Sequence, residues 1–116
     1  MTQAAVTPFN SNYNDTFPFS NTCIDILLAA STVISWTVPG ISTQQYRANF
    51  SVSLSADVWV CKNGTAAVPT SNTVGSVPYQ ERIGDNFFRY LNGGDTLSFI
   101  STGTPQVGVS LLLVQQ

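Results

Sequence analysis

The chain has 116 residues, the length of one domain, and only 9% of them are charged, against roughly 25% in an average soluble domain. Its net charge is −2 and its four basic residues are spread along the chain, so it has no basic patch with which to neutralise nucleic-acid phosphates. It contains no histidine, which excludes Ser/His and Cys/His catalytic pairs and histidine metal sites.

Residues 1–21 are polar with scattered aromatic side chains, and neither a strand period nor a helix period fits them. We interpret them as an irregular arm. Its aromatic residues either pack back onto this chain's own domain or lie over a neighbouring subunit. These residues are Phe9, Tyr13, Phe17 and Phe19. The arm lacks the basic and apolar regions of a secretion signal, and no apolar run is long enough to span a bilayer, so we expect neither a leader nor a membrane partner.

From Thr22 onward the patterns are typical of β-strands. Apolar residues predominate in 22–29, and 32–38 carries Val33, Ile34 and Trp36 and ends at the turn pair Pro39-Gly40. The clearest strand covers 46–54, where apolar and polar residues alternate. Its predicted core face consists of Tyr46, Ala48, Phe50, Val52 and Leu54.

The next predicted strand, 57–62, places Val58 and Val60 on one face and Trp59 and Cys61 on the other. It ends at Asn63-Gly64, the sequence of a two-residue hairpin turn. Residues 65–79 contain two prolines and predict a loop with a short edge strand near 74–79.

The last third of the chain predicts three strands. Residues 86–91 are rich in aromatic side chains, and apolar residues alternate near 97–99 and through 107–113. Asp95 follows Gly93-Gly94 and is expected to cap a turn by accepting backbone N–H bonds. The whole pattern predicts one antiparallel β-sandwich of jelly-roll type, with about eight strands and no helix, over residues 22–116.

No group of residues predicts catalysis. Among the acids only Glu81 and Asp85 are close in sequence, and they flank Arg82 in an expected loop, which favours a solvated surface over a glycosidase pair. Cys23 and Cys61 are expected to be buried free thiols, with a disulfide between neighbouring strands as the alternative. We therefore expect a protein that is not an enzyme and has no metal or cofactor.

Trp36 and Trp59 both lie in apolar strand contexts. We expect them to pack in the core or between subunits, and the alternative is a platform on which a sugar ring stacks. The low charge and the apolar content of 43% predict a homo-oligomer, a dimer or a trimer, with part of the Trp36/Trp59 or Phe87/Phe88 surface at its interface. The candidate partner-binding residues are therefore Phe9, Tyr13, Phe17, Phe19, Trp36 and Trp59.

Three short segments, residues 55–60, 62–65 and 91–97, occur in this order before a final strand. With these segments, residues 46–116 resemble the small jelly-roll virion proteins of tailed bacteriophages that decorate capsids. They also resemble, more weakly, the C1q/tumour-necrosis-factor-like heads of fibres. In both groups a leucine and a Gly-Asp turn precede the penultimate strand.

The first resemblance implies a structural protein on the capsid surface, made in the host cytoplasm, which clamps neighbouring major capsid subunits against internal pressure. Its implied partners are the major capsid protein and further copies of itself. The second resemblance implies a fibre or spike head that binds a bacterial surface glycan. No collagen-like or coiled-coil stalk precedes the predicted sandwich, so we expect the first role.

Overall fold

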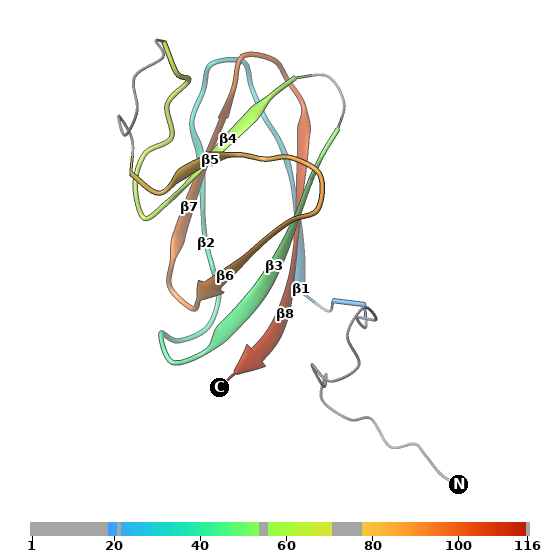
Figure 1. Ribbon diagram of the computed structural model, residues 1–116, viewed down its shortest axis with the longest axis vertical. Helices are drawn as coiled ribbons and strands as arrows, with labels where there is room; N and C mark the ends of the chain where they lie inside the picture. The colour runs from blue at the N-terminus through green and yellow to red at the C-terminus, as the bar shows by residue number, and fades with distance from the viewer. Residues whose placement is uncertain (1–18, 21, 54–55, 71–77, 116) are drawn as a thin grey trace, which may run out of the picture.

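The computed structural model describes residues 19–20, 22–53, 56–70 and 78–115. These residues form eight strands and no helix, in two four-stranded sheets that face each other across one core (Figure 1). The strands are β1 (Thr22–Leu27), β2 (Ile34–Thr37), β3 (Gln45–Val52), β4 (Val58–Lys62), β5 (Gln80–Arg82), β6 (Phe87–Asn92), β7 (Thr96–Ser101) and β8 (Gln106–Gln115). The predicted all-β sandwich is therefore confirmed. The described part of the chain holds no helix with the length and apolar character needed to cross a membrane.

All strand pairs are antiparallel, and each sheet joins distant parts of the chain. Sheet A has the order β1-β8-β3-β6, and sheet B has the order β2-β7-β4-β5. Four pairs join β1 with β8, β2 with β7, β3 with β6 and β4 with β5. The two halves of the chain therefore pair like the arms of one long hairpin. Further pairs, β3 with β8 and β4 with β7, fold this hairpin over into the two sheets.

The core lies between the sheets and is filled by alternate residues of the strands. In β3, Ala48 and Phe50 are buried while Asn49 and Ser51 are exposed, as the alternation over 46–54 predicted. Leu54, the last residue of the predicted core face, lies outside the described residues. The alternation predicted for β8 is also confirmed, with Val107, Val109 and Leu111 buried. The Phe50 ring meets the Phe87 ring edge-on, with 5.2 Å between their centroids. Such a ring pair adds about 0.5–1.5 kcal/mol beyond the area that it buries.

A second, smaller apolar cluster lies on the outer face of sheet B. Residues 63–70 run over this face and bury Ala66 against Cys61 and Ile100. Ser98 is buried beneath them, and its hydroxyl accepts a hydrogen bond from the Ala66 N–H and donates one to the Gly64 carbonyl, both at 2.8 Å. These bonds satisfy the polar groups that the covering segment buries.

This covering segment explains why the predicted hairpin at Asn63-Gly64 is wrong. Asn63 does adopt a left-handed conformation, with φ of 57°, but the strand that pairs with β4 begins only at Gln80. The short edge strand expected near 74–79 is found as β5 instead. Residues 71–77 lie outside the described chain, and 78–79 form a turn. The side-chain amide of Gln80 bonds both backbone groups of Ala67, at 2.8 and 2.9 Å, and so fixes the segment to β5.

Candidate functional site

The structure separates the two tryptophans that were predicted to bind a partner. Trp36 pairs with Leu97 across β2 and β7, and its side chain packs against the main core. Trp59 lies opposite Ile100 and packs against the outer cluster of sheet B. Because the two side chains lie on opposite faces of one sheet, they do not form a common platform for a sugar ring.

The predicted aromatic residues of the arm are only partly described. Phe9, Tyr13 and Phe17 lie outside the described residues. Phe19 is fully exposed, with no contact that hides its ring from solvent. It lies three residues before Thr22, where β1 begins and where the sequence placed the start of the sandwich.

The two cysteines lie on opposite outer faces of the sandwich and are both free thiols. Cys61 faces outward from sheet B beneath the covering segment, and its burial raises the pKa of the thiol above the usual value. Cys23 was expected to be buried, which is wrong. It faces outward on the edge strand β1, opposite Ser110, and is exposed.

A groove crosses the outer face of sheet A, and we call it the outer groove. It has a volume of about 190 Å³ and is lined by Phe19, Ser20, Arg47, Asn49, Phe88, Ser110, Leu111 and Leu112. The strand register brings Tyr90, Arg47 and Leu112 side by side across β6, β3 and β8. The Arg47 guanidinium lies over the Phe88 ring, 4.6 Å from its centroid. The outer groove thus combines apolar surface with one cation held on an aromatic ring.

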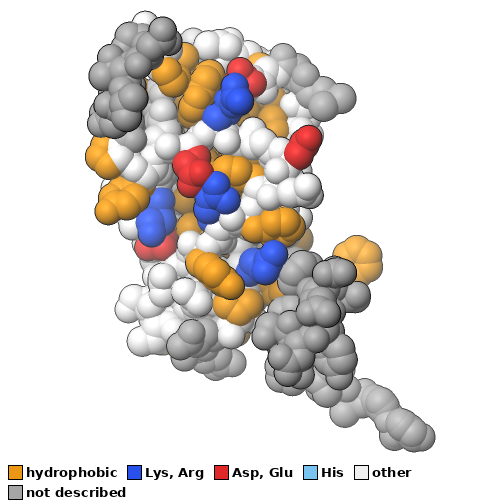
Figure 2. Space-filling view, in the orientation of Figure 1, with side chains coloured by type: hydrophobic (Ala, Val, Ile, Leu, Met, Phe, Trp, Pro, Cys, Tyr) orange, Lys and Arg blue, Asp and Glu red, His pale blue; other side chains and the backbone are white. Residues whose placement is uncertain are grey.

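The chain enters the sandwich at this groove. The Ser20 hydroxyl accepts a hydrogen bond from the Thr22 N–H at 3.0 Å and donates one to the Leu111 carbonyl of β8. These bonds fix the point from which the preceding residues leave the domain. In the same region Tyr90 is 60% exposed, and Figure 2 shows apolar side chains between the Lys and Arg side chains over β5 and β6.

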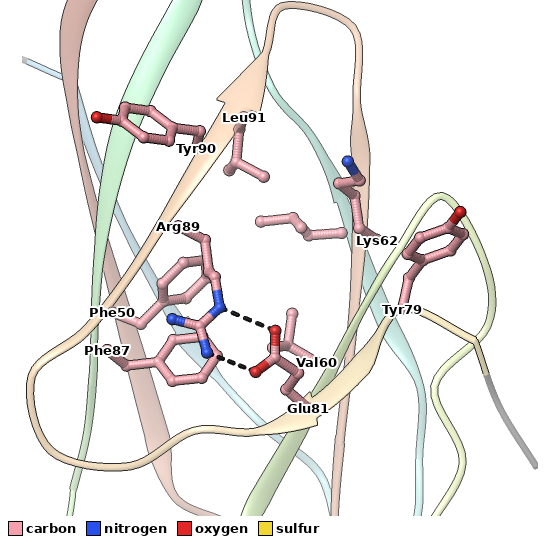
Figure 3. Close-up of a pocket in the computed structure, with 10 residues that line it drawn as sticks. Phe50, Val60, Lys62, Tyr79, Glu81, Phe87, Arg89, Tyr90 and Leu91 are labelled. Carbon is pink, nitrogen blue, oxygen red and sulfur yellow. Dashed lines mark hydrogen bonds and ion pairs between the residues drawn. The ribbon is translucent and has the colours of Figure 1, made fainter. Parts of the chain in front are cut away.

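A second hollow, which we call the edge cavity, opens between the sheets at their β5 and β6 edges (Figure 3). Its volume is about 160 Å³. The floor is apolar and comes from both sheets, with Phe50, Val60, Phe87, Leu91 and Leu97. The rim is polar or amphipathic, with Lys62, Tyr79, Glu81, Arg89 and Tyr90.

An ion pair spans the mouth of the edge cavity. Arg89 Nε donates to Glu81 Oε2 at 2.8 Å, and its Nη2 donates to Glu81 Oε1 (Figure 3). The guanidinium also lies 4.0 Å from the centroid of the Phe87 ring and bonds the Phe88 carbonyl. The hydrogen bonds and charge of Arg89 hold the pKa of the Glu81 carboxyl below its usual value.

The sequence did not predict this ion pair, because it placed Glu81 in a loop near Asp85. The structure places Glu81 in β5, opposite Val60, so its side chain faces the inter-sheet space. The sequence of β6 does contain a signal for Arg89, the ion-pair partner of Glu81. Arg89 occupies the inward-facing position between Phe87 and Leu91, where the alternation otherwise selects apolar residues.

A third, polar hollow of about 530 Å³ contains the remaining described carboxylates that lie near one another. Asp57 and Asp85 both line it, and Asp57 also pairs with Arg82 at 4.0 Å on the surface. Within the described ranges no three His, Cys, Asp or Glu side chains are grouped so that they could hold a metal ion. This hollow therefore offers no ligand set that goes beyond two separate acids.

Comparisons with known proteins identify no relative of this chain. No family model, curated protein or solved structure matches the chain. Function is therefore inferred from the outer groove, the edge cavity and the anchor of the chain at Ser20.

Proposed function

We propose that this protein is a non-enzymatic structural protein that decorates a tailed-phage capsid and clamps neighbouring major capsid subunits. The observation that carries the proposal is the anchoring of Ser20 to β8 beside the outer groove. The arm thereby starts beside the groove that the half-buried Phe88 and Leu112 line. Together, an arm and an apolar groove at one face supply a larger contact surface than the groove supplies alone.

We also propose that the sandwich is of jelly-roll type, the fold that the resemblance to small virion proteins implies. The pairing of β1 with β8, β2 with β7, β3 with β6 and β4 with β5 supports this. A jelly roll consists of eight antiparallel strands in two sheets, connected by Greek-key crossings.

The clamp works through two contacts on different subunits. The outer groove binds one capsid subunit, and the arm orders against the next one, with Phe9, Tyr13 and Phe17 as anchors in apolar pockets. Each contact is weak alone, but joining the two makes the second one intramolecular and raises the overall affinity. Such work needs no catalytic group.

The protein acts in this proposal as a homo-oligomer, a dimer or a trimer. The low fraction of charged residues, 9%, gives weak repulsion between copies. Phe87, which the sequence offered as an interface residue, is only 6% exposed and belongs to the core. Phe88, the other residue of this pair, is half-buried and lines the outer groove.

A second candidate function is a fibre or spike head that binds a bacterial surface glycan. The observation that favours it is the pair of exposed tyrosines on the rim of the edge cavity, Tyr79 at 77% and Tyr90 at 60%. Sugar rings stack on such side chains. The apolar floor of the cavity, however, offers few partners for sugar hydroxyls, so we favour the capsid.

The test is binding to phage capsids that lack this protein. Full-length protein should saturate them with a fixed number of copies per capsid, as measured by co-sedimentation. Leu112→Asp places a charge in the outer groove and should weaken binding at least tenfold. Thr104→Asp, at an exposed turn residue, is the matched control and should bind like the unmodified protein. No binding by the full-length chain, or equal binding by both variants, contradicts the proposal. Binding to bacterial polysaccharide instead would favour the glycan function.

A further inference from the structure

We propose that the edge cavity is the docking site for the phenyl ring of Phe9 from the protein's own N-terminal segment. In the free protein the arm would then lie across the outer groove and place this ring between the sheets. This docking takes place in the free protein without any capsid, so it does not depend on the proposed function.

The size and chemistry of the cavity fit one aromatic ring. Its floor consists of carbon-rich side chains from both sheets, and its volume is about 160 Å³. Apolar protein cavities of about 150 Å³ stay dry and bind benzene. The polar groups stand at the rim, where Glu81 and Arg89 already satisfy each other. The cavity therefore fits an apolar ring, and its floor offers no hydrogen-bond partner to a polar group.

The reach of the arm selects among its aromatic residues. From Ser20, which is bonded to Leu111 of β8, the path to the cavity crosses at least two strand spacings of about 4.8 Å and turns around β6 into the inter-sheet space, about 5 Å further. An extended chain spans at most about 3.3–3.6 Å per residue. Three residues before Ser20, Phe17 has a backbone reach of at most about 11 Å on a path of about 15 Å. Its side chain could cover the rest only from a straight, fully extended chain, and the turn around β6 rules this out. Tyr13 and Phe9, seven and eleven residues before Ser20, both reach.

Chemistry then distinguishes these two rings. The hydroxyl of Tyr13 would enter the apolar floor first, where it finds no hydrogen-bond partner among Phe50, Leu91 and Leu97. The ring of Phe9 carries no polar atom, so its burial has no such cost.

The charges along the path also favour this arrangement. A shallow hollow lined by Arg47, Phe88, Arg89 and Tyr90 joins the outer groove to the edge cavity. Asp15 is the single acid among residues 1–18 and stands between the anchor at Ser20 and Phe9. The arm therefore brings its carboxylate to the part of the surface that carries two guanidinium groups.

The first experiment compares methyl NMR spectra of the full-length protein with those of Phe9→Ala and, as the matched control, Tyr13→Ala. Removal of the Phe9 ring should shift the methyl resonances of Val60, Leu91 and Leu97, and the control should leave them in place. Unchanged methyl resonances in Phe9→Ala, or equal shifts in both variants, would overturn the proposal.

The second experiment uses toluene as a probe for the free cavity. The tethered Phe9 ring competes with toluene at an effective concentration near millimolar. The apparent affinity for toluene is therefore reduced in proportion to the fraction of molecules whose cavity is empty. Phe9→Ala should bind toluene at least tenfold more tightly than the unmodified chain, and equal affinity would contradict the docking. The methyl shifts should also be independent of protein concentration, because dependence would assign the ring to a second copy and overturn the own-chain docking.

Discussion

At the level of single residues, the Glu81–Arg89 pair is the one charged link between the two sheets among the described residues. It is bidentate, and its side chains are 51% and 44% exposed. Solvent screens a pair of this exposure, so we expect Glu81→Gln to lower the free energy of unfolding by only about 0.2–1 kcal/mol, as measured by urea denaturation. Asp57→Asn is the control, because its pair with Arg82 is 4.0 Å long and more exposed. An equal loss in both variants would show that the bidentate geometry contributes nothing.

The same pair makes the stability depend on pH. Arg89 lowers the pKa of Glu81 in the folded state below the unfolded value of about 4.3. Its contribution is therefore fully present above about pH 4.3, and it is lost as the pH falls through the folded-state pKa. The difference in unfolding free energy between the unmodified protein and Glu81→Gln should shrink below about pH 4. A difference that stays constant down to pH 2 would contradict this account.

The two thiols should differ in reactivity. Cys23 is exposed on β1, whereas burial raises the pKa of Cys61 and keeps its thiol uncharged at neutral pH. In the folded protein at pH 8, a thiol reagent should modify one cysteine quickly and the other only after unfolding. Cys23→Ser should remove the fast reaction. Fast modification of Cys61 in that variant would mean that the segment over sheet B opens readily.

At the level of elements, the sequence predicted those strands whose patterning depends on the core alone. The alternation in β3 and β8 places Ala48, Phe50, Val107 and Val109 correctly, because one buried face determines a period of two. The Asn63-Gly64 signal failed for a tertiary reason. Residues 63–70 are needed to cover the outer face of sheet B, and a local turn preference does not reveal that requirement.

Ser98 is the test of this covering segment. Its hydroxyl bonds the Ala66 N–H and the Gly64 carbonyl, and it is buried. Ser98→Ala leaves both backbone groups without their partner and should cost about 1–3 kcal/mol of unfolding free energy. Ser110→Ala, on the outer face of sheet A, should cost less than half as much. If the two variants are equally stable, the segment does not depend on this serine.

For the molecule as a whole, the sequence predicted the sandwich but only part of the candidate site. Trp36 and Trp59 were predicted to bind a partner because they are large aromatic residues, yet they lie on opposite faces of sheet B. The outer groove and the edge cavity were missed, because they form where β8, β3 and β6 meet and where the open edges of two sheets face each other. Such pairings join residues far apart in the chain and leave no signal at short spacing.

Removal of the N-terminal arm tests its role, and the contacts of Ser20 decide where the chain should be cut. Ser20 anchors the chain to Leu111, so a cut after residue 18 removes the arm and preserves this anchor, whereas a cut after residue 21 would remove both. The chain that starts at Phe19 retains every described strand, so it should still fold cooperatively. Its melting temperature should be lower than that of the full-length protein, because the cut also removes the Phe9 ring from the edge cavity.

The most direct measurement of the capsid proposal is the melting temperature of capsids that lack this protein, recorded after saturation with either chain. We predict that the full-length protein raises the melting temperature and that the chain without residues 1–18 fails to raise it. No rise with the full-length protein, or the same rise with the shortened chain, would contradict a clamp that depends on the arm.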